Sequence, residues 1–451
     1  MNLHRLLAQR AEEGRPVTIG LVGAGKFGSM LLAQLQRTTG MHLVGVTDLD
    51  PQRARDALLH VGWAPERIGA SSLDDALRSG TTHVGDDTEA LIAADIEVVV
   101  EATGNPAAGV RHALMAIEHG KHVVMVNVEA DAMAGALLAR RAEAAGVVYS
   151  LAYGDQPALI AEQVDWARAA GFEVVAAGKG TKYLPEFHYS TPETAWPYYG
   201  LTAEEAAEGG MNSQMFNSFL DGTKSAIEMA AVANATGLNA APGGLAFPPA
   251  GVDDLPAVLR PASEGGSLAS KGLVEVVSSL HRDGSEVYRH MRWGVYVVVE
   301  APDEYVSRCF HEYGFLADDS GRYAAMYRPF HLIGLEAGIS VASAALRHEP
   351  TGSPREFRAD AVAVAKRDLQ PGDVLDGEGG YTVRGVLMPG EDSLARGALP
   401  IGLAHRVKVT KPVARDELLT YAAVELDNSL EAVRIRREME ATFRVPAGAR
   451  A

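Results

Sequence analysis

The feature that most constrains what this chain can fold into is the glycine pattern Gly23-x-Gly25-x-x-Gly28. It directly follows an apolar run of β type, residues 17–22, and it opens a helical stretch. An acidic residue, Asp48, ends the next apolar run about 20 residues further on, as the dinucleotide fingerprint requires. The pattern alone is weak, but in this context it predicts a strand, a tight turn and a helix that bind a dinucleotide.

Each glycine has a separate task in such a turn. Gly23 permits the tight bend, Gly25 lets a pyrophosphate approach the backbone, and Gly28 allows the helix to pack closely on the strand. The helix N-terminus supplies free N–H groups and partial positive charge to the phosphates. We therefore predict that Gly23, Gly25, Lys26, Phe27 and Gly28 bind the cofactor. The alternative is a glycine turn of an α/β domain that binds no nucleotide.

The residues after the second strand bear on the choice between NAD and NADP. Asp48 is placed to accept hydrogen bonds from both ribose hydroxyls of NAD, and its charge would repel a 2′-phosphate. Arg53 and Arg55 follow it in a stretch that is also typical of a solvated helix face. Arg53 would bind the 2′-phosphate if Asp48 turned away. NAD is the direct expectation, and NADP stays open.

Further apolar runs continue the pattern of the first strand, with helical patterns between them. They span residues 42–47, 96–100, 122–126 and 147–151. Strands that alternate with helices predict the α/β class, here a Rossmann doubly wound parallel sheet. We expect this dinucleotide-binding domain to cover residues 1–155.

Small and polar residues follow two of these strands. Thr103 and Gly104 follow the third strand, and Asn127 and Glu129 follow the fourth. The carboxyl ends of strands line the ligand crevice of a doubly wound sheet, so we place Thr103, Gly104 and Asn127 beside the nicotinamide. Glu129 could hold a substrate hydroxyl. Equally, it could be a first-turn acidic residue that stabilises its own helix.

The second half of the chain has a different character. Runs at 273–281 and 290–300 flank Asp283-Gly284, which predicts an antiparallel hairpin and an α+β substrate domain. A helical stretch at 330–347 precedes a linker rich in Pro and Gly. We expect a substrate domain, a small β-rich domain, and a charged helix with a tail, over residues 156–347, 357–426 and 427–451.

The helical stretch at 221–236 carries a narrow polar stripe on a mostly apolar surface. At 100° per residue, Asp221, Lys224 and Glu228 share one face. One interpretation is a solvated face with a Lys224–Glu228 pair. The other is a catalytic face, in which Lys224 is the acid or base and Asp221 sets its orientation. Geometry alone favours the first.

Cationic residues elsewhere could bind an anionic substrate. Lys179 and Lys182 lie in a glycine-rich segment, Gly178 to Lys182, which we interpret as a loop that follows a strand and binds an anion. Arg328 and His331 precede the helical stretch at 330–347 and could add cationic contacts. A packing role for His331 is the alternative.

Composition restricts the class of partner. The chain has 451 residues and a formal net charge of -17, which argues against nucleic acid or an anionic membrane as the main partner. A single cysteine, Cys309, excludes an internal disulfide and a multi-cysteine metal site. The charged first residues do not resemble a signal peptide. We expect a cytoplasmic homo-oligomer that acts on a small molecule and has no metal site of its own.

The quoted motifs resemble the homoserine-dehydrogenase-like group of NAD(P) oxidoreductases. The resemblance rests on the glycine fingerprint, Glu101-Ala-Thr-Gly104, the run Gly120 to Asn127, Gly178-Lys-Gly-Thr181 and the Asp221–Lys224 stretch. It implies that Asp221 and Lys224 bind substrate and assist proton transfer. Homoserine dehydrogenases carry a lysine where this chain has Val128, so homoserine is not the expected substrate.

The chain is also similar to bacterial proteins that join this core to a C-terminal SAF domain. Ala365-Lys-Arg-Asp-Leu-Gln-Pro-Gly372 resembles the SAF signature. One branch of that set is the DXR-like (DRL) reductoisomerase, which makes 2-C-methylerythritol 4-phosphate from 1-deoxyxylulose 5-phosphate for isoprenoid biosynthesis, with NADPH and a divalent metal.

The resemblances imply an NAD(P)-dependent oxidoreductase of carbohydrate metabolism acting on a small polyhydroxylated carbonyl compound, a sugar phosphate or sugar acid. The DXR-like reductoisomerase is the first alternative. A non-catalytic NAD(H)-sensing protein is the second.

Overall fold

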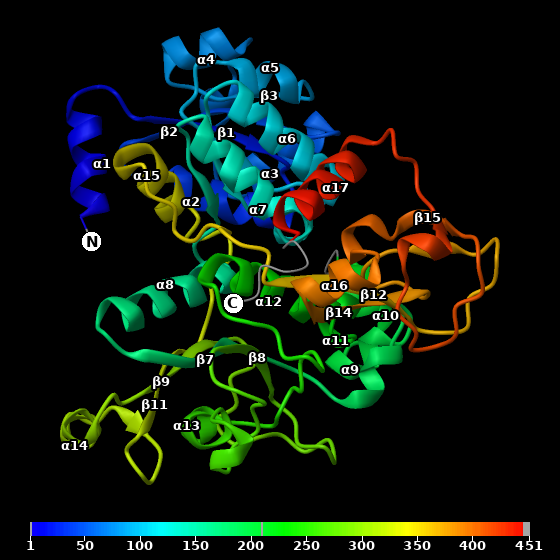
Figure 1. The fold of residues 1–451 in the computed structure, drawn as a ribbon. Helices are drawn as coiled ribbons and strands as arrows, with labels where there is room; N and C mark the ends of the chain where they lie inside the picture. The colour runs from blue at the N-terminus through cyan, green and yellow to red at the C-terminus, as the bar shows by residue number, and fades with distance from the viewer. Residues whose placement is uncertain (1, 209–210, 445–451) are drawn as a thin grey trace. The chain divides into compact units, whose positions relative to one another are not determined.

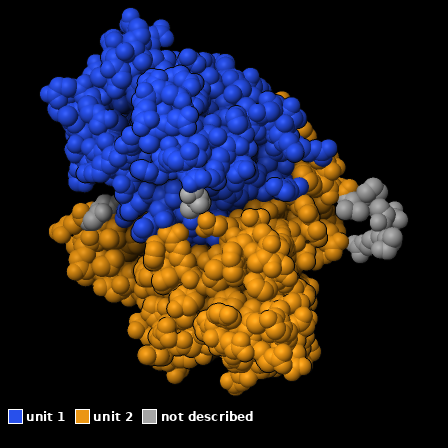
Figure 2. Space-filling model, turned by 90° about the vertical axis from the view of Figure 1, so that its left-hand side faces the viewer, with its two compact units in different colours: residues 1–159, 332–355 blue, residues 160–331, 356–451 orange. Residues whose placement is uncertain are grey.

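The structure is a computed structural model that describes residues 2–208 and 211–444. The chain divides into two compact units, coloured separately in Figure 2. Unit 1 comprises Met1–Leu159 and Leu332–Arg355, and unit 2 comprises Ile160–His331 and Glu356–Ala451. The expected tail beyond residue 444 lies outside the described residues. None of the helices within the described ranges combines the length and apolarity needed to cross a membrane.

Unit 1 is built on a six-stranded parallel sheet in the order β3-β2-β1-β4-β5-β6. Figure 1 labels β1, β2 and β3 of this sheet. The predicted Rossmann doubly wound fold is therefore confirmed. Its strands are β1 (Val17–Val22), β2 (Met41–Thr47), β3 (His83–Gly85), β4 (Val98–Glu101), β5 (His122–Met125) and β6 (Tyr149–Leu151). Its helices are α1 (Leu3–Glu12), α2 (Lys26–Leu35), α3 (Pro51–His60), α4 (Leu73–Ser79), α5 (Thr88–Ala93), α6 (Pro106–Glu118), α7 (Val128–Ala144) and α15 (Gly338–Arg347).

Helix α15 returns to unit 1 from far along the sequence. Ala337, Val341 and Ala342 are buried in the same apolar cluster as the β1 side chains. The hydroxyl of Ser340 accepts a hydrogen bond from the amide of Tyr153 at 2.7 Å. The helix begins at Gly338, so the expected helix over 330–347 is wrong in its first two turns. A parallel sheet needs helices over both of its faces, and α15 supplies part of that cover. Because side chains on both faces of the strands are buried, the strand sequences are almost continuously apolar.

Unit 2 contains a five-stranded mixed sheet in the order β10-β11-β9-β7-β8. The turn predicted at Asp283-Gly284 forms, with an antiparallel bridge between Leu280 and Glu286, but the predicted pairing of the two long strands is wrong, because β8 and β9 are not neighbours. β7 lies between them and runs parallel to β8 and antiparallel to β9. The strands are β7 (Glu173–Thr181), β8 (Leu273–Ser278), β9 (Val295–Glu300), β10 (Leu316–Ala317) and β11 (Tyr323–Arg328). The helices that precede or accompany them are α8 (Gln156–Ala169), α9 (Ala195–Tyr199), α10 (Ala203–Glu208), α11 (Ser213–Leu220), α12 (Thr223–Thr236), α13 (Leu255–Val258) and α14 (Glu304–Glu312).

The glycine-rich segment at 178–181 is part of β7 and not the expected loop. A Cβ atom on Gly178 would lie 1.7 Å from the carbonyl oxygen of Glu275, and one on Gly180 would lie 1.9 Å from that of Met291. Glycine inside a strand often marks such a close approach of neighbouring backbone. These glycines therefore allow close packing in the sheet, and their presence does not indicate an anion-binding loop.

The helix expected over 221–236 begins two residues later than expected, at Thr223, and follows a separate helix, α11. α11 ends at Leu220, Gly222 has a φ of 89°, and α12 begins at Thr223. A left-handed residue interrupts a helix, and glycine adopts that conformation without the strain a Cβ would cause. Asp221 is the C-cap of α11, so it does not belong to the helical face assigned to it.

The part of unit 2 from Glu356 to the last described residue, 444, is called the C-terminal segment, and it packs on α12. The Asn234 side chain accepts hydrogen bonds from the amides of Arg358 and Ala359 at 2.7 and 3.0 Å, and donates one to the Ala359 carbonyl at 3.1 Å. The division into units thus groups this segment with residues 160–331, whereas the sequence predicts a separate domain over 357–426. Its elements are β12 (Ala359–Ala365), β13 (Val374–Asp376), β14 (Val383–Pro389), α16 (Gly390–Arg396), β15 (His405–Val409), β16 (Val424–Glu425) and α17 (Glu431–Phe443).

Helix α17 is anchored by a fully buried arginine. The guanidinium of Arg436 donates to both oxygens of Asp360, at 3.1 and 2.5 Å, and its Nε donates to Glu440 at 2.9 Å. The side chains of Arg436 and Asp360 are 0% and 1% exposed. A buried ion of this kind is tolerated only when it is paired and hydrogen-bonded, so the end of the chain depends on this network.

We predict that Arg436→Met lowers the free energy of unfolding by about 3–5 kcal/mol, because it leaves the buried Asp360 carboxylate without its cation. Arg434→Met, on the exposed face of the same helix, should cost at most about 0.5 kcal/mol. Urea titration followed by circular dichroism measures both. Equal losses in the two variants would show that the buried network does not anchor the helix.

Candidate functional site

The glycine turn between β1 and α2 has the geometry that a dinucleotide needs. Gly23 has a φ of 96°, and a Cβ there would lie 2.7 Å from the carbonyl oxygen of Ala102. A Cβ on Gly28 would lie 2.4 Å from the carbonyl oxygen of Gly23. Gly25 differs, because a Cβ there meets no described heavy atom within 4 Å. Two glycines are thus required by the fold itself, and the third leaves open space where a pyrophosphate would approach.

The start of α2 completes this turn. Gly25 is the N-cap and its helix end has no side-chain cap, so its first amides are available to an external acceptor. Lys26 is exposed and Phe27 is half-buried. A helix N-terminus with open backbone in front of it is a ready anion site, and these residues fit the phosphates of NAD or NADP.

Asp48 lies at the carboxyl end of β2, beside the glycine turn. Its carboxylate accepts hydrogen bonds from the Ala24 amide at 2.9 Å, from the Asp50 amide at 3.1 Å and from Arg53 at 2.7 Å. Burial favours the neutral form, but the hydrogen bonds from Arg53 and the two amides prevail and lower the pKa of Asp48. The side chain is therefore ionised at neutral pH, as the expected contact with ribose hydroxyls requires. Arg53 is paired with it instead of being turned toward a separate phosphate.

The loop after β4 is held by a buried carboxylate. Glu101 is fully buried, and its Oε1 accepts from the hydroxyl of Thr103 at 2.5 Å and lies 3.2 Å from Nδ1 of His112. Its Oε2 is buried and has no hydrogen-bond partner among the described residues. Thr103 and Gly104 are exposed, so Glu101 orients a loop that a ligand can reach. No sequence pattern indicates His112, and Glu101 is predicted only as part of the motif Glu101-Ala-Thr-Gly104, without a role of its own.

Asn127 connects this loop to the next strand. Its side-chain amide donates to the Asn105 carbonyl at 2.8 Å, while its oxygen caps α7 by accepting from the Ala130 amide at 3.1 Å. Thr103, Gly104 and Asn127 therefore lie together at the carboxyl ends of β4 and β5, the edge where a doubly wound sheet binds ligand.

Glu129 lies in the first turn of α7 and is buried. Two residues on, Asp131 accepts a hydrogen bond from the Tyr149 hydroxyl at 3.0 Å, and burial raises the pKa of Asp131 to about 7. The described residues contain no cluster of three or more His, Cys, Asp or Glu side chains that could hold a metal ion. Residues 2–208 and 211–444 therefore offer no such cluster for the metal of the reductoisomerase hypothesis.

In unit 2, α12 faces the sheet with an ion pair. Lys179 of β7 and Glu228 of α12 pair with each other, and their side chains are 6% and 5% exposed. Their charges compensate each other, so Lys179 lacks the excess positive charge of the expected anion seat. Glu228 therefore pairs with Lys179 of the sheet. Helix geometry alone suggests a different pair, between Glu228 and Lys224 on a solvated face. Lys224 is half-buried and lies one turn before Glu228.

The other predicted cations have varied surroundings. Lys182 donates to the Tyr198 carbonyl at 2.5 Å, and its pKa is lowered by burial and then by Arg292. His331 has Nδ1 2.8 Å from the Trp293 carbonyl. Burial lowers the pKa of His331, although the charge of Glu228 opposes this. His331 therefore belongs to the neighbourhood of the Lys179–Glu228 pair, and Arg328 stacks its guanidinium 4.5 Å from the Phe330 ring.

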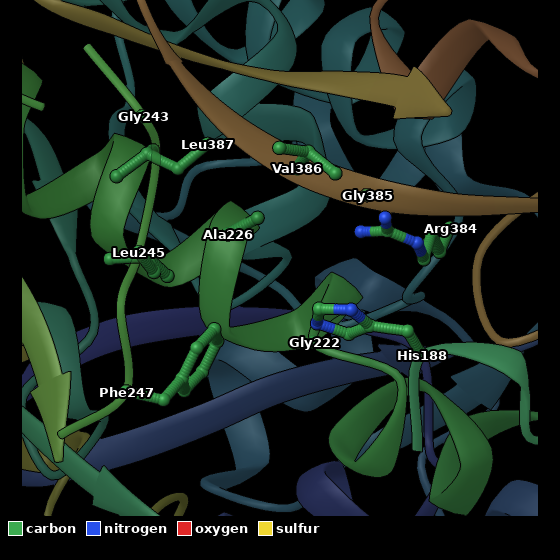
Figure 3. A pocket seen from close by; sticks show the side chains of 10 residues that line it. All are labelled: His188, Gly222, Ala226, Gly243, Leu245, Phe247, Arg384, Gly385, Val386 and Leu387. Atoms are coloured by element: carbon green, nitrogen blue, oxygen red, sulfur yellow. The ribbon is translucent and has the colours of Figure 1, made fainter. Parts of the chain in front are cut away.

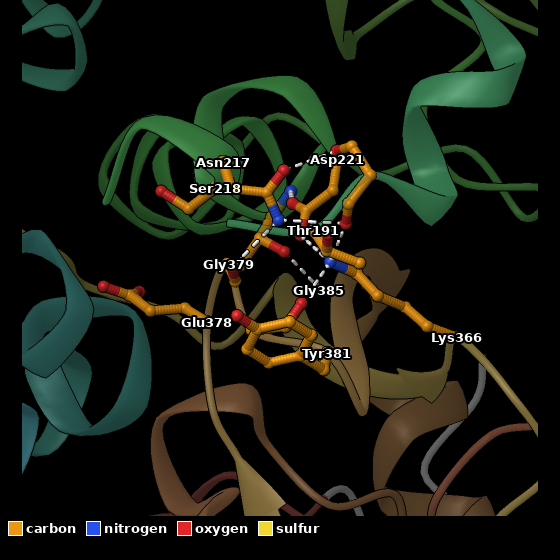
Figure 4. Close-up of polar contacts among 12 residues, drawn as sticks. Thr191, Asn217, Ser218, Asp221, Lys366, Glu378, Gly379, Tyr381 and Gly385 are labelled. Atoms are coloured by element: carbon orange, nitrogen blue, oxygen red, sulfur yellow. Dashed lines mark hydrogen bonds and ion pairs between the residues drawn. The ribbon is translucent and has the colours of Figure 1, made fainter. Parts of the chain in front are cut away.

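Asp221 is fixed by Lys366, a residue of the quoted run Ala365 to Gly372 to which the sequence pattern assigns no site role. Its Oδ2 forms an ion pair of 2.6 Å with Lys366, and its Oδ1 accepts from the Thr223 amide at 2.9 Å. Lys366 also donates to the carbonyls of Ser190 and Gly380, at 2.9 and 2.7 Å. Figure 4 shows the Lys366 amino group directed into this cluster. The sequence predicts that Asp221 orients Lys224. In the structure, Asp221 instead forms a buried ion pair with Lys366 of the C-terminal segment.

Two family models match consecutive parts of the chain. Residues 23–151 match the homoserine dehydrogenase NAD binding domain, and residues 154–337 match the catalytic domain of the oxidoreductase DRL. Consecutive stretches of the chain are thus similar to an NAD-binding domain and to an oxidoreductase catalytic domain, and the first of them carries the Rossmann sheet. The segment that resembles a SAF domain lies beyond both matches and stays a prediction.

Individual relatives resemble only part of the chain. Inositol 2-dehydrogenases from Burkholderia cenocepacia and Burkholderia multivorans are 34% and 33% identical over 106 residues, 23% of this chain. The chain spans about a quarter, 26%, of the length of these relatives. Among solved structures, an oxidoreductase domain protein from Kribbella flavida is 21% identical, with a TM-score of 0.27 over 37% of this chain and 43% of its own. An apo scyllo-inositol dehydrogenase from Lactobacillus casei is 18% identical, with a TM-score of 0.25 over 37% and 46%. These scores are too low to carry a structural argument.

We predict that Gly25→Val abolishes binding of NAD and NADP without unfolding the protein. The added methyl groups enter open space in the free chain, whereas a pyrophosphate would need that space. Calorimetric titration with both cofactors measures binding, and the melting temperature reports the fold.

Gly28→Ala is the matched control, because its Cβ would collide with the Gly23 carbonyl and should lower the melting temperature. Undiminished cofactor affinity in a folded Gly25→Val protein would contradict the assignment of this turn.

Proposed function

We propose that the chain is an NAD(P)-dependent oxidoreductase that interconverts an alcohol and a carbonyl on a small polyhydroxylated compound. The observation that carries the proposal is the turn at Gly25, where the backbone leaves open space in front of the α2 N-terminus. The match of residues 23–151 to an NAD-binding domain and of residues 154–337 to an oxidoreductase catalytic domain supports it. NAD is the favoured cofactor, because the ionised Asp48 would repel a 2′-phosphate.

A neutral polyol is the substrate class that the charges of unit 2 support best. Lys179 is neutralised by Glu228, which leaves Lys182 and Arg328 as the remaining predicted cations for a phosphate. The names of the Burkholderia relatives, inositol 2-dehydrogenases, are consistent with a polyol. Sugar acids and sugar phosphates are the further members of the proposed class.

Lys224 is the proposed acid and base. When bound, the nicotinamide supplies the hydride acceptor for oxidation of the alcohol. Lys224, in its neutral form, takes the hydroxyl proton at Nζ as the carbinol C–H bond breaks, and it returns that proton in the reverse direction. Asp221 positions the helix, because it accepts the Thr223 amide at the start of α12 and is held there by Lys366.

The DXR-like reductoisomerase is the second candidate, favoured by the match of residues 154–337 to the DRL catalytic domain. Glu129 would then act near a substrate hydroxyl. No step is assigned to a metal, because the described residues show no donor cluster for one.

A substrate panel separates these functions. Reduced nicotinamide absorbance is followed with NAD and NADP on myo-inositol, scyllo-inositol, aldonic acids and sugar phosphates, and with NADPH on 1-deoxyxylulose 5-phosphate. Turnover of a polyol supports the proposal, and consumption of NADPH with 1-deoxyxylulose 5-phosphate supports the second candidate. Cofactor binding without turnover on the whole panel would favour the NAD(H)-sensing alternative.

We predict that Lys224→Ala lowers kcat by about 10²–10⁴-fold, the usual range for a lost acid or base, and leaves cofactor affinity unchanged. Lys224→Arg should fail in the same way, because a guanidinium keeps the charge but does not release a proton near neutral pH. The exposed Lys411→Ala is the control for loss of a lysine. Recovery of turnover in Lys224→Arg would reduce Lys224 to an ion-pairing role.

A further inference from the structure

Unit 2 contains a cavity of about 160 Å³ that the proposed function does not use. Its walls come from the start of α12, from the loop at 243–247, from His188 and from β14 of the C-terminal segment. Figure 3 shows Arg384 and His188 at one end of the cavity and Leu245 and Leu387 at the other. The cavity thus has a polar end and an apolar end.

The cavity lies on a different face of α12 from the proposed acid and base. Ala226 lines the cavity and follows Lys224 by two residues, which turns its side chain about 200° around the helix. Gly222, the N-cap of α12, also lines the cavity. A ligand there would therefore contact the helix from the side that Lys224 and Glu228 do not occupy.

The polar end carries an incompletely bonded cation. The Arg384 side chain is 13% exposed, and its one hydrogen bond to a carboxylate is a long one, 3.4 Å from Nη2 to Asp416. Its Nε is buried and has no hydrogen-bond partner among the described residues. An arginine normally satisfies its donors when it is buried, so a missing acceptor is indicated here.

His188 adds a neutral group beside this cation. Burial first, and then the charge of Arg384, lower the pKa of His188 to about 4, while Asp416 opposes the shift and Lys366 adds to it. The imidazole is uncharged at neutral pH. The lining side chains of the polar end therefore present a single positive charge, that of Arg384.

The apolar end is held in an unusual conformation. Phe247 has a φ of 52°, in the left-handed region that a bulky residue rarely adopts. Its amide donates to the buried Glu275 carboxylate at 3.3 Å, and its ring stacks on Tyr183 with centroids 4.0 Å apart. Backbone strain of this kind persists where surrounding contacts fix it, and it concentrates at ligand sites.

We propose that this cavity binds a small organic monocarboxylate, with its carboxylate on Arg384 and its hydrocarbon body against Phe247 and Leu387. An apolar cavity of about 150 Å³ in another protein holds benzene, so the volume suits a body of five or six carbons. One arginine matches one negative charge, and a charge-assisted hydrogen bond from its guanidinium to a carboxylate is among the stronger ones. A phosphate dianion would leave a charge uncompensated against apolar walls.

Calorimetry with defined probes tests the proposal on the full-length protein. The probes are 3-methylbutyrate, its neutral analogue 3-methylbutanamide, and inorganic phosphate. We expect the acid to bind, the amide to bind at least tenfold more weakly, and phosphate not to displace the acid. Equal binding of acid and amide would overturn the proposal, and tighter binding of phosphate would overturn the choice of a carboxylate.

Variants locate the binding. Arg384→Met should weaken 3-methylbutyrate binding at least tenfold, and Ala226→Leu should do the same by filling the opposite wall. Arg367→Met removes the same charge from the C-terminal segment at an exposed pair with Asp373, and should leave binding unchanged. Unchanged affinity in a folded Arg384→Met or Ala226→Leu protein would overturn the assignment, and a loss in Arg367→Met would show a nonspecific charge effect. If Arg384→Met fails to fold, Ala226→Leu alone decides.

Discussion

The buried ion pair between Asp221 and Lys366 is the interaction on which the organisation of unit 2 depends. Two ions removed from water are costly, and such a pair persists when further hydrogen bonds satisfy both partners. Here Lys366 also donates to two carbonyls, and Asp221 also accepts the amide that begins α12. Three features therefore meet at this ion pair. They are the break between α11 and α12, the start of the helix that carries Lys224, and the contact of the C-terminal segment with the rest of unit 2.

This arrangement gives the C-terminal segment a direct role in unit 2. Asn234 at the other end of α12 bonds to Arg358 and Ala359, so the segment contacts the helix along its length. The helix in turn presents Glu228 to Lys179 of the sheet. α12 is thus held by an ion pair to the sheet and by backbone hydrogen bonds to the C-terminal segment, which gives its polar residues defined positions.

Unit 1 could be predicted from sequence because its determinants are local. The turn at Gly23 to Gly28, the acidic residue after β2 and the alternation of strands and helices are short-range patterns with known geometry. Unit 2 could not be predicted in the same way. About ninety residues separate β7 from β8 in sequence, and more separate it from β9, yet β7 lies between them in the sheet. Because β8 and β9 follow each other in sequence, the sequence pattern predicts that these two strands pair as a hairpin. Likewise, Lys366 lies far from Asp221 in sequence, and nothing near either residue indicates the pair.

We predict a strong energetic coupling between Asp221 and Lys366, and hydrogen exchange at the α12 amides measures it most directly. Lys366→Met and Asp221→Asn should each lower the free energy of opening of α12 by about 3–5 kcal/mol, because each leaves an uncompensated buried charge. The double variant should be more stable than either single one, since it removes both charges. Small and additive losses would contradict the claim that this pair organises the helix.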